Sequence, residues 1–484
     1  MKRILKLLLV ALVIISGVVA VRTYIPAQAP QAGTPYVFEP DAGAIAQIMS
    51  EAVGYKTISY GRDKPTSAKE LKAFHRFLRR KFPLVHRRLT HEVVADYSLL
   101  YTWKGSAPTQ KPVVLLGHLD VVPVIPAQWK QPPFKGIIKD GFIWGRGTLD
   151  NKVNIVGILS AAEAMLREGK TPTRTIYFAF GHDEEQGGLD GARALAKVLK
   201  TRGVQAEFVL DEGGAVTSGV LPGSTTRMAV IAPAEKGIVT LTLTAPGDGG
   251  HSSTPPAQTA IGILAAGITK LEANQFPRDF SHTKTFFESI ADDFALPLRI
   301  VMKNLWLFEP VVMFSLRNDF QVQAGMRTTT AATVIAGGVK SNVLPIRATA
   351  KVNFRILPGE TPDTVRARVI EVMDDPRIDV AFDGSGQMGM GPSPVSPQAG
   401  YGWETIISAI RDISAPEKIL IAPRLLVGAT DTRHYREISP NHYRFVYMNV
   451  AREDLGGIHG TNERIGVNAL KDTVRFFHRL MTSL

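Results

Sequence analysis

Short apolar runs alternate with amphipathic segments through the first half of this chain. The runs are rich in β-branched residues and too short for helices, which indicates buried strands. The segments between them show the i, i+3, i+4 spacing of helices that lay one apolar face on a sheet. This alternation predicts an α/β fold with a mainly parallel sheet covered on both faces. The predicted strands are 92–99, 113–116, 175–180 and 208–210, and the predicted helices are 44–51, 67–81, 154–167 and 189–200.

The pattern changes near residue 235, where a strand of alternating apolar and polar residues begins a different series of elements. Their β-α-β-β-α-β order is that of a ferredoxin-like α+β unit, one sheet with its helices on one face. Sequential αβ units resume after a stretch rich in Gly and Pro at 384–400, so this unit is predicted to be inserted in the first domain. Its predicted strands are 238–243, 328–335, 348–356 and 378–382, and its predicted helices are 260–271 and 363–373.

Residues 276–320 form a segment that the six-element unit does not need. The segment holds eight of the 22 phenylalanines of the chain, together with Trp306. Ordinary packing between helices would explain this density. An apolar wall for a substrate and a contact with a partner are the alternatives.

The first 22 residues differ from everything that follows them. Lys2, Arg3 and Lys6 precede the apolar run 7–21, whose only polar residue is Ser16. A charged segment followed by an apolar run is typical of an export signal, and Val18 to Ala20 would serve as a small-residue cleavage site. A retained membrane anchor through residues 4–21 is the rival hypothesis. The apolar run of fifteen residues is shorter than the roughly 20 residues that span a bilayer comfortably. Both predict that the rest of the chain is exported to the periplasm or another extracytoplasmic space, and a buried cytosolic helix is the third alternative.

Composition removes two classes of function. The formal charge is +12, and the rest of the chain carries +8 once the four cations of the N-terminal segment are subtracted. No basic run is interleaved with aromatic residues, so we do not expect nucleic acid as a partner. The absence of cysteine excludes thiolate metal sites, so that any metal ion must be held by His, Asp and Glu.

Three predicted strands each end in a histidine or a carboxylate. The first ends in G-H-L-D with His118, the second in G-H-D-E-E-Q-G-G with Glu184 and Glu185, and the third in D-E-G-G with Asp211. Between the first two lies G-R-G-T-L-D-N-K with Asp150. Because the carboxyl ends of strands in an open α/β sheet converge on one crevice, these side chains are expected to meet. One imidazole and several carboxylates suit a zinc-like divalent ion.

These motifs, in this order and with G-G-I-H-G-T-N-E near the end, resemble those of the di-zinc amidohydrolases and metallopeptidases. That family includes aminoacylase, glutamate carboxypeptidase and succinyl-diaminopimelate desuccinylase. The match is closest to the carboxypeptidase S branch, which also contains secreted hydrolases and synthases of N-fatty-acyl amino acids. The resemblance runs from about residue 40 to the end of the chain. A single H-x-D or E-E is a weak signal, whereas five motifs in order are a strong one.

The resemblance implies two Zn²⁺ per subunit, with Co²⁺ or Mn²⁺ as substitutes, and a role for each matching residue. Asp150 would bridge the ions, with His118 and Asp211 on one ion and Glu185 and His459 on the other. Asp120 would orient His118, as ligating histidines generally require. Glu184 would be the general base. The order of Glu184 and Glu185, and the choice of Asp211 over Glu212, come from the resemblance, because sequence physics does not separate these neighbours.

The resemblance also implies a substrate-binding set. His251, in G-G-H-S-S, would stabilise an oxyanion, in dimeric members at the partner's site, and its alternative is a histidine in a turn. The remaining members are Asn342, Arg355, Thr430 and Arg433. An arginine suits a free carboxylate because its fork can bond both oxygens. Monomer and homodimer both stay open.

The sequence therefore predicts zinc-dependent hydrolysis of an amide bond next to a free carboxylate, in N-acyl amino acids or small peptides. A dipeptidase is the alternative within this class, and a non-catalytic binding module on the same fold is the alternative outside it. Phosphoesterase chemistry is disfavoured by the resemblance alone. The predicted division is a signal peptide or anchor at 1–26, a linker at 27–40, a catalytic domain at 41–233 and 384–484, and an inserted lid or dimerisation domain at 234–383.

Overall fold

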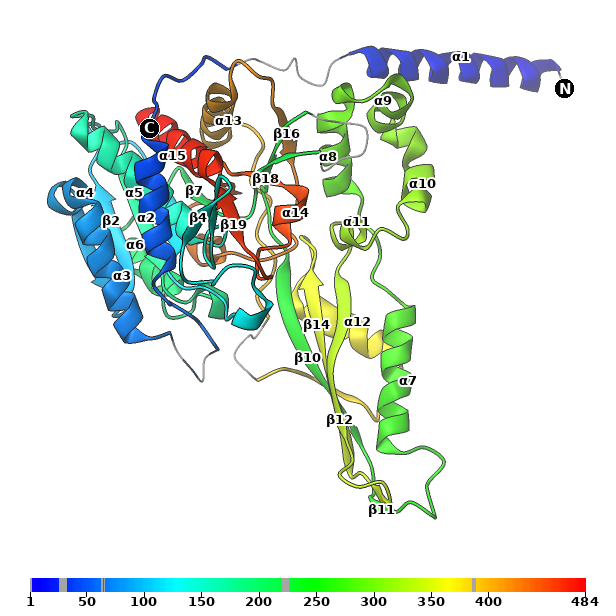
Figure 1. Cartoon of the computed structure of the whole chain (residues 1–484). Coiled ribbons are helices and arrows are strands. Elements are labelled where there is room, and N and C mark those ends of the chain that lie inside the picture. Colours follow the sequence, from blue (N-terminus) through cyan, green and yellow to red (C-terminus); the bar gives the residue numbers. More distant parts are fainter. Residues whose placement is uncertain (1, 26–32, 62–63, 65, 220–225, 385–388) are drawn as a thin grey trace.

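The computed structural model describes residues 2–25, 33–61, 64, 66–219, 226–384 and 389–484. Figure 1 shows a large α/β body, from which a unit of long strands extends downward and a single helix extends at the top. Of the predicted linker at 27–40, residues 27–32 lie outside the described part. The same holds for residues 385–388 in the stretch rich in Gly and Pro.

A six-stranded sheet forms the centre of the body. Strands β6, β3, β7 and β17 are parallel, whereas β2 and β1 continue the sheet in antiparallel fashion. The predicted strand 92–99 is two strands, because the chain turns at Ala95 and Asp96, which both have positive φ. The sheet order is β1 (Thr90–Val94), β2 (Ser98–Trp103), β6 (Ile176–Gly181), β3 (Val113–His118), β7 (Phe208–Asp211) and β17 (His442–Arg444).

Helices cover both faces of this sheet, as its continuous apolar strands predict. Val113 and Leu115 of β3 face one apolar cluster, whereas Val114 and Leu116 face another that contains α6 (Ala192–Thr201). This separation follows from the period of two along a strand. Helix α15, from the end of the chain, packs on α5 from the first half. The first cluster is built from α2 (Ala42–Val53), α3 (Ala68–Lys81), α4 (Pro83–Arg88), α5 (Lys152–Arg167), α13 (Tyr401–Ser414) and α15 (Val467–Thr482).

Two smaller sheets and several short helical elements complete the body. A second sheet has the order β16 (Leu420–Pro423), β9 (Met228–Ile231), β8 (Val216–Ser218) and β18 (Asn449–Ala451). A third has the order β19 (Arg464–Gly466), β5 (Phe142–Trp144) and β4 (Ile137–Lys139). The short helical elements are η1 (Pro126–Gln128), η2 (Glu184–Gln186), η4 (Asp431–Tyr435) and α14 (Arg452–Leu455).

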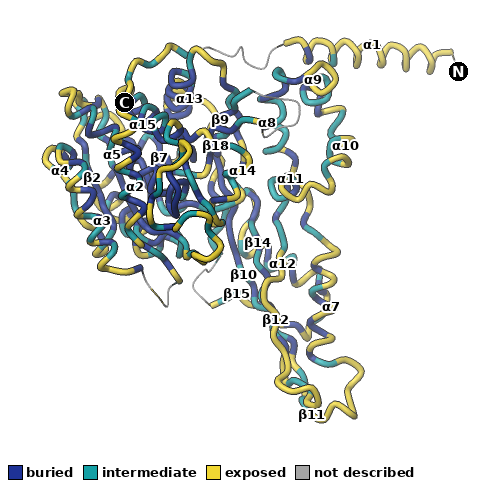
Figure 2. Tube along the Cα trace, in the orientation of Figure 1, coloured by how far each residue is buried: buried dark blue, intermediate teal, exposed yellow. Residues whose placement is uncertain are grey.

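The extending unit, called the lid unit here, has the predicted β-α-β-β-α-β order. Its antiparallel sheet has the order β12-β14-β10-β15, and both helices cover one face. Figure 2 shows that its far end, around β11, is exposed. The elements are β10 (Gly237–Pro246), β11 (Gly250–His251), α7 (Ala260–Ala273), β12 (Thr329–Gly337), β13 (Val343–Leu344), β14 (Arg347–Ile356), α12 (Pro362–Met373) and β15 (Asp379–Phe382).

Phe276, at the start of the phenylalanine-rich segment, packs in the core of the lid unit, whereas the short helices that follow it pack on the body. Phe286, Ile290 and Phe294 share an apolar cluster with Met228 of β9 and Ala422 of β16. We call these elements the helical segment, and Figure 1 shows them beside the second sheet. They are α8 (Ser281–Ile290), η3 (Ala291–Asp293), α9 (Leu296–Lys303), α10 (Leu305–Ser315) and α11 (Phe320–Ala324).

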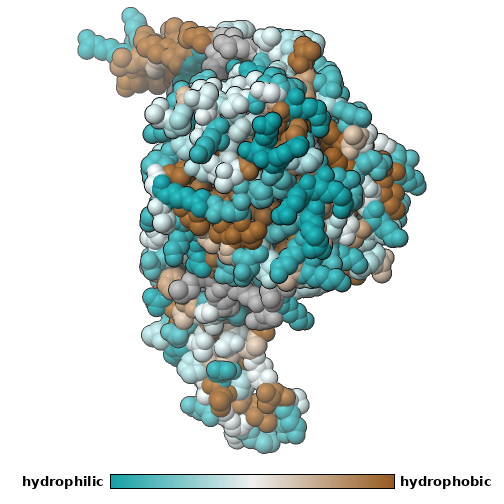
Figure 3. Space-filling view, turned by 90° about the vertical axis from the view of Figure 1, so that its left-hand side faces the viewer, coloured by the Kyte–Doolittle hydropathy of each residue, from teal (hydrophilic) through white to brown (hydrophobic). Residues whose placement is uncertain are grey.

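The N-terminal apolar run is a single helix, α1 (Lys2–Tyr24). The helix has 23 residues, and its most apolar window has a mean hydropathy of 2.9. It is therefore long and apolar enough to cross a membrane. Figure 3 shows α1 at the top left as a hydrophobic projection that ends in hydrophilic residues. This agrees with the predicted signal peptide or anchor.

Candidate metal centre

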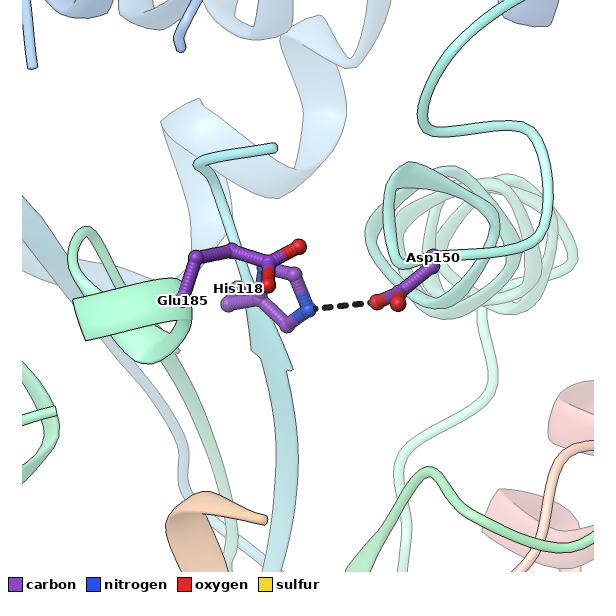
Figure 4. Close-up of side chains that lie close together, drawn as sticks. All are labelled: His118, Asp150 and Glu185. Carbon is purple, nitrogen blue, oxygen red and sulfur yellow. Dashed lines mark hydrogen bonds and ion pairs between the residues drawn. The ribbon is translucent and has the colours of Figure 1, made fainter. Parts of the chain in front are cut away.

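Asp150 lies between two imidazoles at the carboxyl edge of the main sheet. Strand β3 delivers the buried His118, whose Nε2 is 2.9 Å from Asp150 Oδ1. The loop after α14 delivers His459, whose Nε2 is 3.0 Å from Asp150 Oδ2. Each carboxylate oxygen therefore faces a different imidazole, which is the arrangement that a carboxylate bridging two ions requires. Figure 4 shows that the side chains of His118, Asp150 and Glu185 converge.

Carboxylates from two further strand ends close this cluster. Glu185 follows β6, and its Oε2 is 3.1 Å from His459 Nε2, while its buried Oε1 has no hydrogen-bond partner. Glu212 follows β7, and its Oε1 is 3.3 Å from His118 Nε2. Asp211 is buried behind it, with Oδ1 accepting the Glu212 N–H and Oδ2 without a partner. The structure thus brings Glu212 to His118, where the resemblance implies Asp211.

Asp120 holds the histidine and the two neighbouring glutamates in place. Its carboxylate accepts hydrogen bonds from the backbone N–H groups of Glu184 and Glu185, both at 3.2 Å, and from Ser59 Oγ at 2.7 Å. Its main-chain carbonyl lies 3.0 Å from His118 Nδ1. Because Nδ1 is engaged in this way, Nε2 of His118 is left free to face the cluster.

A buried ion pair that the sequence reasoning missed joins the loop of Asp150 to the loop of His459. Glu463 is fully buried, accepts the backbone N–H groups of Gly147, Leu149 and Asp150, and lies 2.7 Å from Arg146 Nη1. Arg146 also donates to two carbonyls beside His459, those of Gly457 and Gly460. Both charged residues lie four positions from a predicted ligand, and that position is the signal that could have identified them.

The electrostatics of this cluster favour added positive charge. Burial raises the pKa of Glu212 to about 7 and that of Asp211 to about 6, and repulsion from neighbouring carboxylates adds to both. Hydrogen bonds to Asp150 and Glu185 raise the pKa of His459 to about 10. Divalent cations would relieve both effects, because they favour ionised carboxylates and neutral imidazoles.

The donor set also fits such ions chemically. Ligand atoms of His118, Asp150 and Glu185 lie within 4.8 Å of one another, as do those of His118, Glu184 and Glu212. Imidazole nitrogens and carboxylate oxygens are suitable ligands for zinc and similar metals. The unpartnered oxygens of Glu185 and Asp211 are buried polar atoms of the kind that coordination would satisfy.

Arg433 lies beside the predicted base, Glu184. Arg433, in η4, places Nη2 3.6 Å from Glu184 Oε1. Burial lowers the pKa of Arg355 on β14, with a further lowering by Arg433 and an opposing effect of Glu184. Arg433 thus forms an ion pair with the predicted base, and the charges of Arg433 and Glu184 act on Arg355. Burial raises the pKa of Glu184 well above its ordinary value, and repulsion from Asp431 adds to the shift.

The other predicted substrate-binding residues are not brought to this cluster within one chain. Thr430 is buried, and its backbone N–H and its hydroxyl both donate to Glu235, which also pairs with Arg444. His251 and Asn342 are exposed at the far end of the lid unit, on and beside β11 and β13 (Figure 1). There His251 Nδ1 lies 2.8 Å from Ser253 Oγ.

Comparisons with known proteins agree with this fold. A model of peptidase family M20/M25/M40 matches residues 114–483. N-fatty-acyl-amino acid synthase/hydrolase PM20D1 of Xenopus tropicalis is 38% identical over 485 residues, which covers 98% of this chain and 93% of that protein. Carboxypeptidase S of Saccharomyces cerevisiae is 31% identical, with coverage of 90% and 83%. The crystal structure of the M20 family metallo-carboxypeptidase Sso-CP2 from Sulfolobus solfataricus superposes with a TM-score of 0.65 at 16% identity, covering 90% of this chain and 98% of that one.

The match to the family covers most of the chain, and the two sequence relatives extend over nearly all of it. The architecture and the cluster of imidazoles and carboxylates agree with that match. This chain is therefore a metal-dependent hydrolase that belongs to peptidase family M20/M25/M40.

Proposed function

We propose that this enzyme hydrolyses the amide bond of N-acyl amino acids, with a preference for long acyl chains, and that it uses two zinc ions. The observation that carries the proposal is the arrangement of Asp150 between His118 and His459, with the ion pair of Glu184 and Arg433 beside it. Relatives named for N-fatty-acyl amino acids and for carboxypeptidase activity support the substrate class.

In this proposal Glu184 moves the proton. Bound divalent ions would supply Lewis acidity and lower the pKa of a water molecule. Glu184 would accept a proton from the attacking water and return it to the leaving nitrogen. Its raised pKa suits the second step, because burial stabilises the neutral carboxylic acid that must donate the proton. The Glu184 N–H donated to Asp120 keeps the base fixed beside the ligands.

The arginines would recognise the free carboxylate of the substrate. Arg433 carries a positive charge next to Glu184, and the pKa of Arg355 is lowered by burial and by the charge of Arg433. A carboxylate bound between two guanidinium groups would offset their mutual repulsion, and each fork can bond both oxygens. We therefore expect Arg355→Ala to lower kcat/KM for substrates with a free carboxylate more than for the corresponding amides.

A cavity near the metal centre fits the acyl chain. It has a volume of about 610 Å³ and lies between α8, α11 and the end of α14. Its apolar wall includes Phe286, Phe287, Val322 and Leu455, and Arg424 and Arg452 also line it. Gly456, three positions before His459, also lines the cavity, so the cavity lies within a few residues of the metal centre along the chain.

The acyl-length series tests this proposal. We expect kcat/KM to rise from N-acetyl to N-octanoyl to N-oleoyl forms of one amino acid. Each buried methylene contributes about 0.8 kcal/mol, which is about fourfold in affinity. Phe287→Ala should lower the N-oleoyl value and leave the N-acetyl value near that of the wild type. A flat or falling series would instead favour the dipeptidase alternative.

We further propose that the protein is a homodimer in which His251 serves the partner's site. Within one chain His251 belongs to β11, which lies at the end of the lid unit that points away from the body (Figure 1). Strand β12 is an edge strand whose Val334 and Ile335 are 52% and 62% exposed. An exposed apolar edge strand is a template for pairing with a second copy. Pairing of lid units would present each far end to the other subunit.

Mixing two inactive variants tests this dimer. We expect His251→Ala and Glu184→Gln proteins to be nearly inactive alone and to recover activity when subunits exchange. In a mixed dimer, the site with an intact Glu184 receives His251 from the other subunit. Random exchange would restore about a quarter of wild-type activity. Arg347→Ala, exposed on β14, is the matched control and should not complement Glu184→Gln beyond its own activity. Absence of recovery in a demonstrated mixed dimer would contradict the shared site.

A further inference from the structure

The C-terminal end of α1 is fastened to the helical segment. Asn304, which is fully buried, donates from Nδ2 to Thr23 Oγ1 at 3.1 Å, and Thr23 is itself 2% exposed. Arg22 Nε donates to the carbonyl of Lys303 at 3.1 Å, and Lys303 Nζ donates to the carbonyl of Ile25 at 3.3 Å. The amide of Asn304 also donates to the carbonyl of Ile300 at 2.9 Å, so this buried side chain joins α1 to α9.

This contact sets the level of α1 in a bilayer. A helix of 23 residues is about 34 Å long, and the hydrocarbon core of a bilayer is about 30 Å thick. Lys2, Arg3 and Lys6 at its start place the N-terminus on the cytoplasmic side. The residues that contact α9 therefore lie near the outer interface of the membrane. The helical segment that they hold must lie at the same level.

The helical segment exposes apolar side chains at that level. Helix α10 contains one charged residue, Glu309, and with 11 residues it is too short to span a bilayer. Val311 and Phe314 are 64% and 65% exposed. Large apolar side chains that are exposed together mark a contact surface. We call the following exposed residues the apolar face: Leu296, Leu298, Trp306, Leu307, Val311, Phe314 and Phe320.

The same helices connect this face to the proposed acyl cavity. Leu305, Val312 and Met313 of α10 pack in one cluster with Phe287 and Val322. Phe287 and Val322 line the cavity of about 610 Å³ beside the metal centre. Helix α10, which carries part of the apolar face, thus packs its other side chains against residues that line the cavity.

We propose that α1 is retained as a membrane anchor and that the apolar face lies in the outer leaflet of the phospholipid bilayer. The enzyme takes its long-chain substrates from that leaflet, a step that rests on the proposed function. Interfacial helices of this kind bind by burying apolar area at the boundary of headgroups and acyl chains. An indole such as that of Trp306 favours this boundary.

Trp306 reports membrane contact without any need for activity. The full chain is reconstituted in vesicles of phosphatidylethanolamine and phosphatidylglycerol, with or without lipids brominated near the headgroup. We expect bromination to quench wild-type fluorescence more than that of Trp306→Phe. The other four tryptophans, present in both proteins, cancel in the difference. Equal quenching of the two proteins would overturn the membrane contact.

The intact mass of the protein extracted from membranes tests the anchor. We expect a mass that includes residues 1–25. A mature N-terminus near Val21 would overturn retention, because cleavage there removes Val19 and most of the anchor.

Kinetics test the route of the substrate. The double variant Val311→Gln and Phe314→Gln should lose at least about tenfold in kcat/KM for an N-oleoyl substrate held in vesicles, and should keep wild-type rates on a soluble N-acetyl substrate. Val37→Gln, 94% exposed outside the helical segment, is the matched control. A double variant whose rates equal those of the wild type on both substrates would overturn the proposed route of the substrate. If the wild type hydrolyses neither substrate, the proposed function fails, while the quenching result still stands on its own.

Discussion

Replacement of Glu184 by Gln is expected to lower kcat by about 10³–10⁴-fold, near the upper range for a lost general base. The amide keeps the size of the side chain and the contact of the backbone N–H with Asp120, but it cannot accept a proton. Because Glu184 is not among the proposed ligands, two metal ions should remain bound. Steady-state kinetics on an N-acyl amino acid, together with elemental analysis of the purified protein, measures both quantities.

Glu417→Gln is the matched control, since its side chain is 71% exposed in an ion pair with Arg227 on the body surface. That variant should keep wild-type turnover and metal content. A Glu184→Gln protein that kept more than a few per cent of activity would show that another group moves the proton.

Replacement of Asp150 by Ala should remove metal, activity and stability together. Its two oxygens face His118 and His459 separately, so their loss affects both proposed ion sites. Ligand binding to the native state stabilises it by about 4 kcal/mol when the free ion is at 1,000 times its dissociation constant. We therefore expect Asp150→Ala to unfold at a lower temperature than metal-loaded wild type and near that of chelator-treated wild type. An Asp150→Ala protein with two bound ions would disprove the bridging role.

Metal content also decides between the two neighbours after β7. The resemblance assigns Asp211, whereas the structure brings Glu212 within 3.3 Å of His118. Asp211→Asn and Glu212→Gln should differ in the number of metal ions bound per chain. The residue whose replacement leaves only one bound ion is the ligand. The other variant should keep two ions, because its carboxylate would act only through hydrogen bonds.

Local sequence determined most of the elements and the motif positions. The apolar runs that end in His118, Glu184 and Asp211 are strands β3, β6 and β7, and their carboxyl ends meet as the parallel arrangement predicts. The lid unit has the predicted order of strands and helices. These features depend on periodicity and chain order, which a single sequence carries. The division of 92–99 into two strands was missed, because a turn at Ala95 and Asp96 lacks the Gly or Pro that usually marks one.

Tertiary structure decided how distant segments meet. Arg146 and Glu463 are 317 positions apart, and only folding shows that their buried pair joins the loops of Asp150 and His459. The helical segment lies within the insertion by sequence, yet Phe286 packs on β9 and β16 of the body, and Asn304 binds α1. An apolar residue in the sequence does not indicate which residue it will pack against, because the hydrophobic effect is non-directional. The same limit applies to His251, since its place at the far end of the lid unit follows from the length and direction of β10, not from the motif around it.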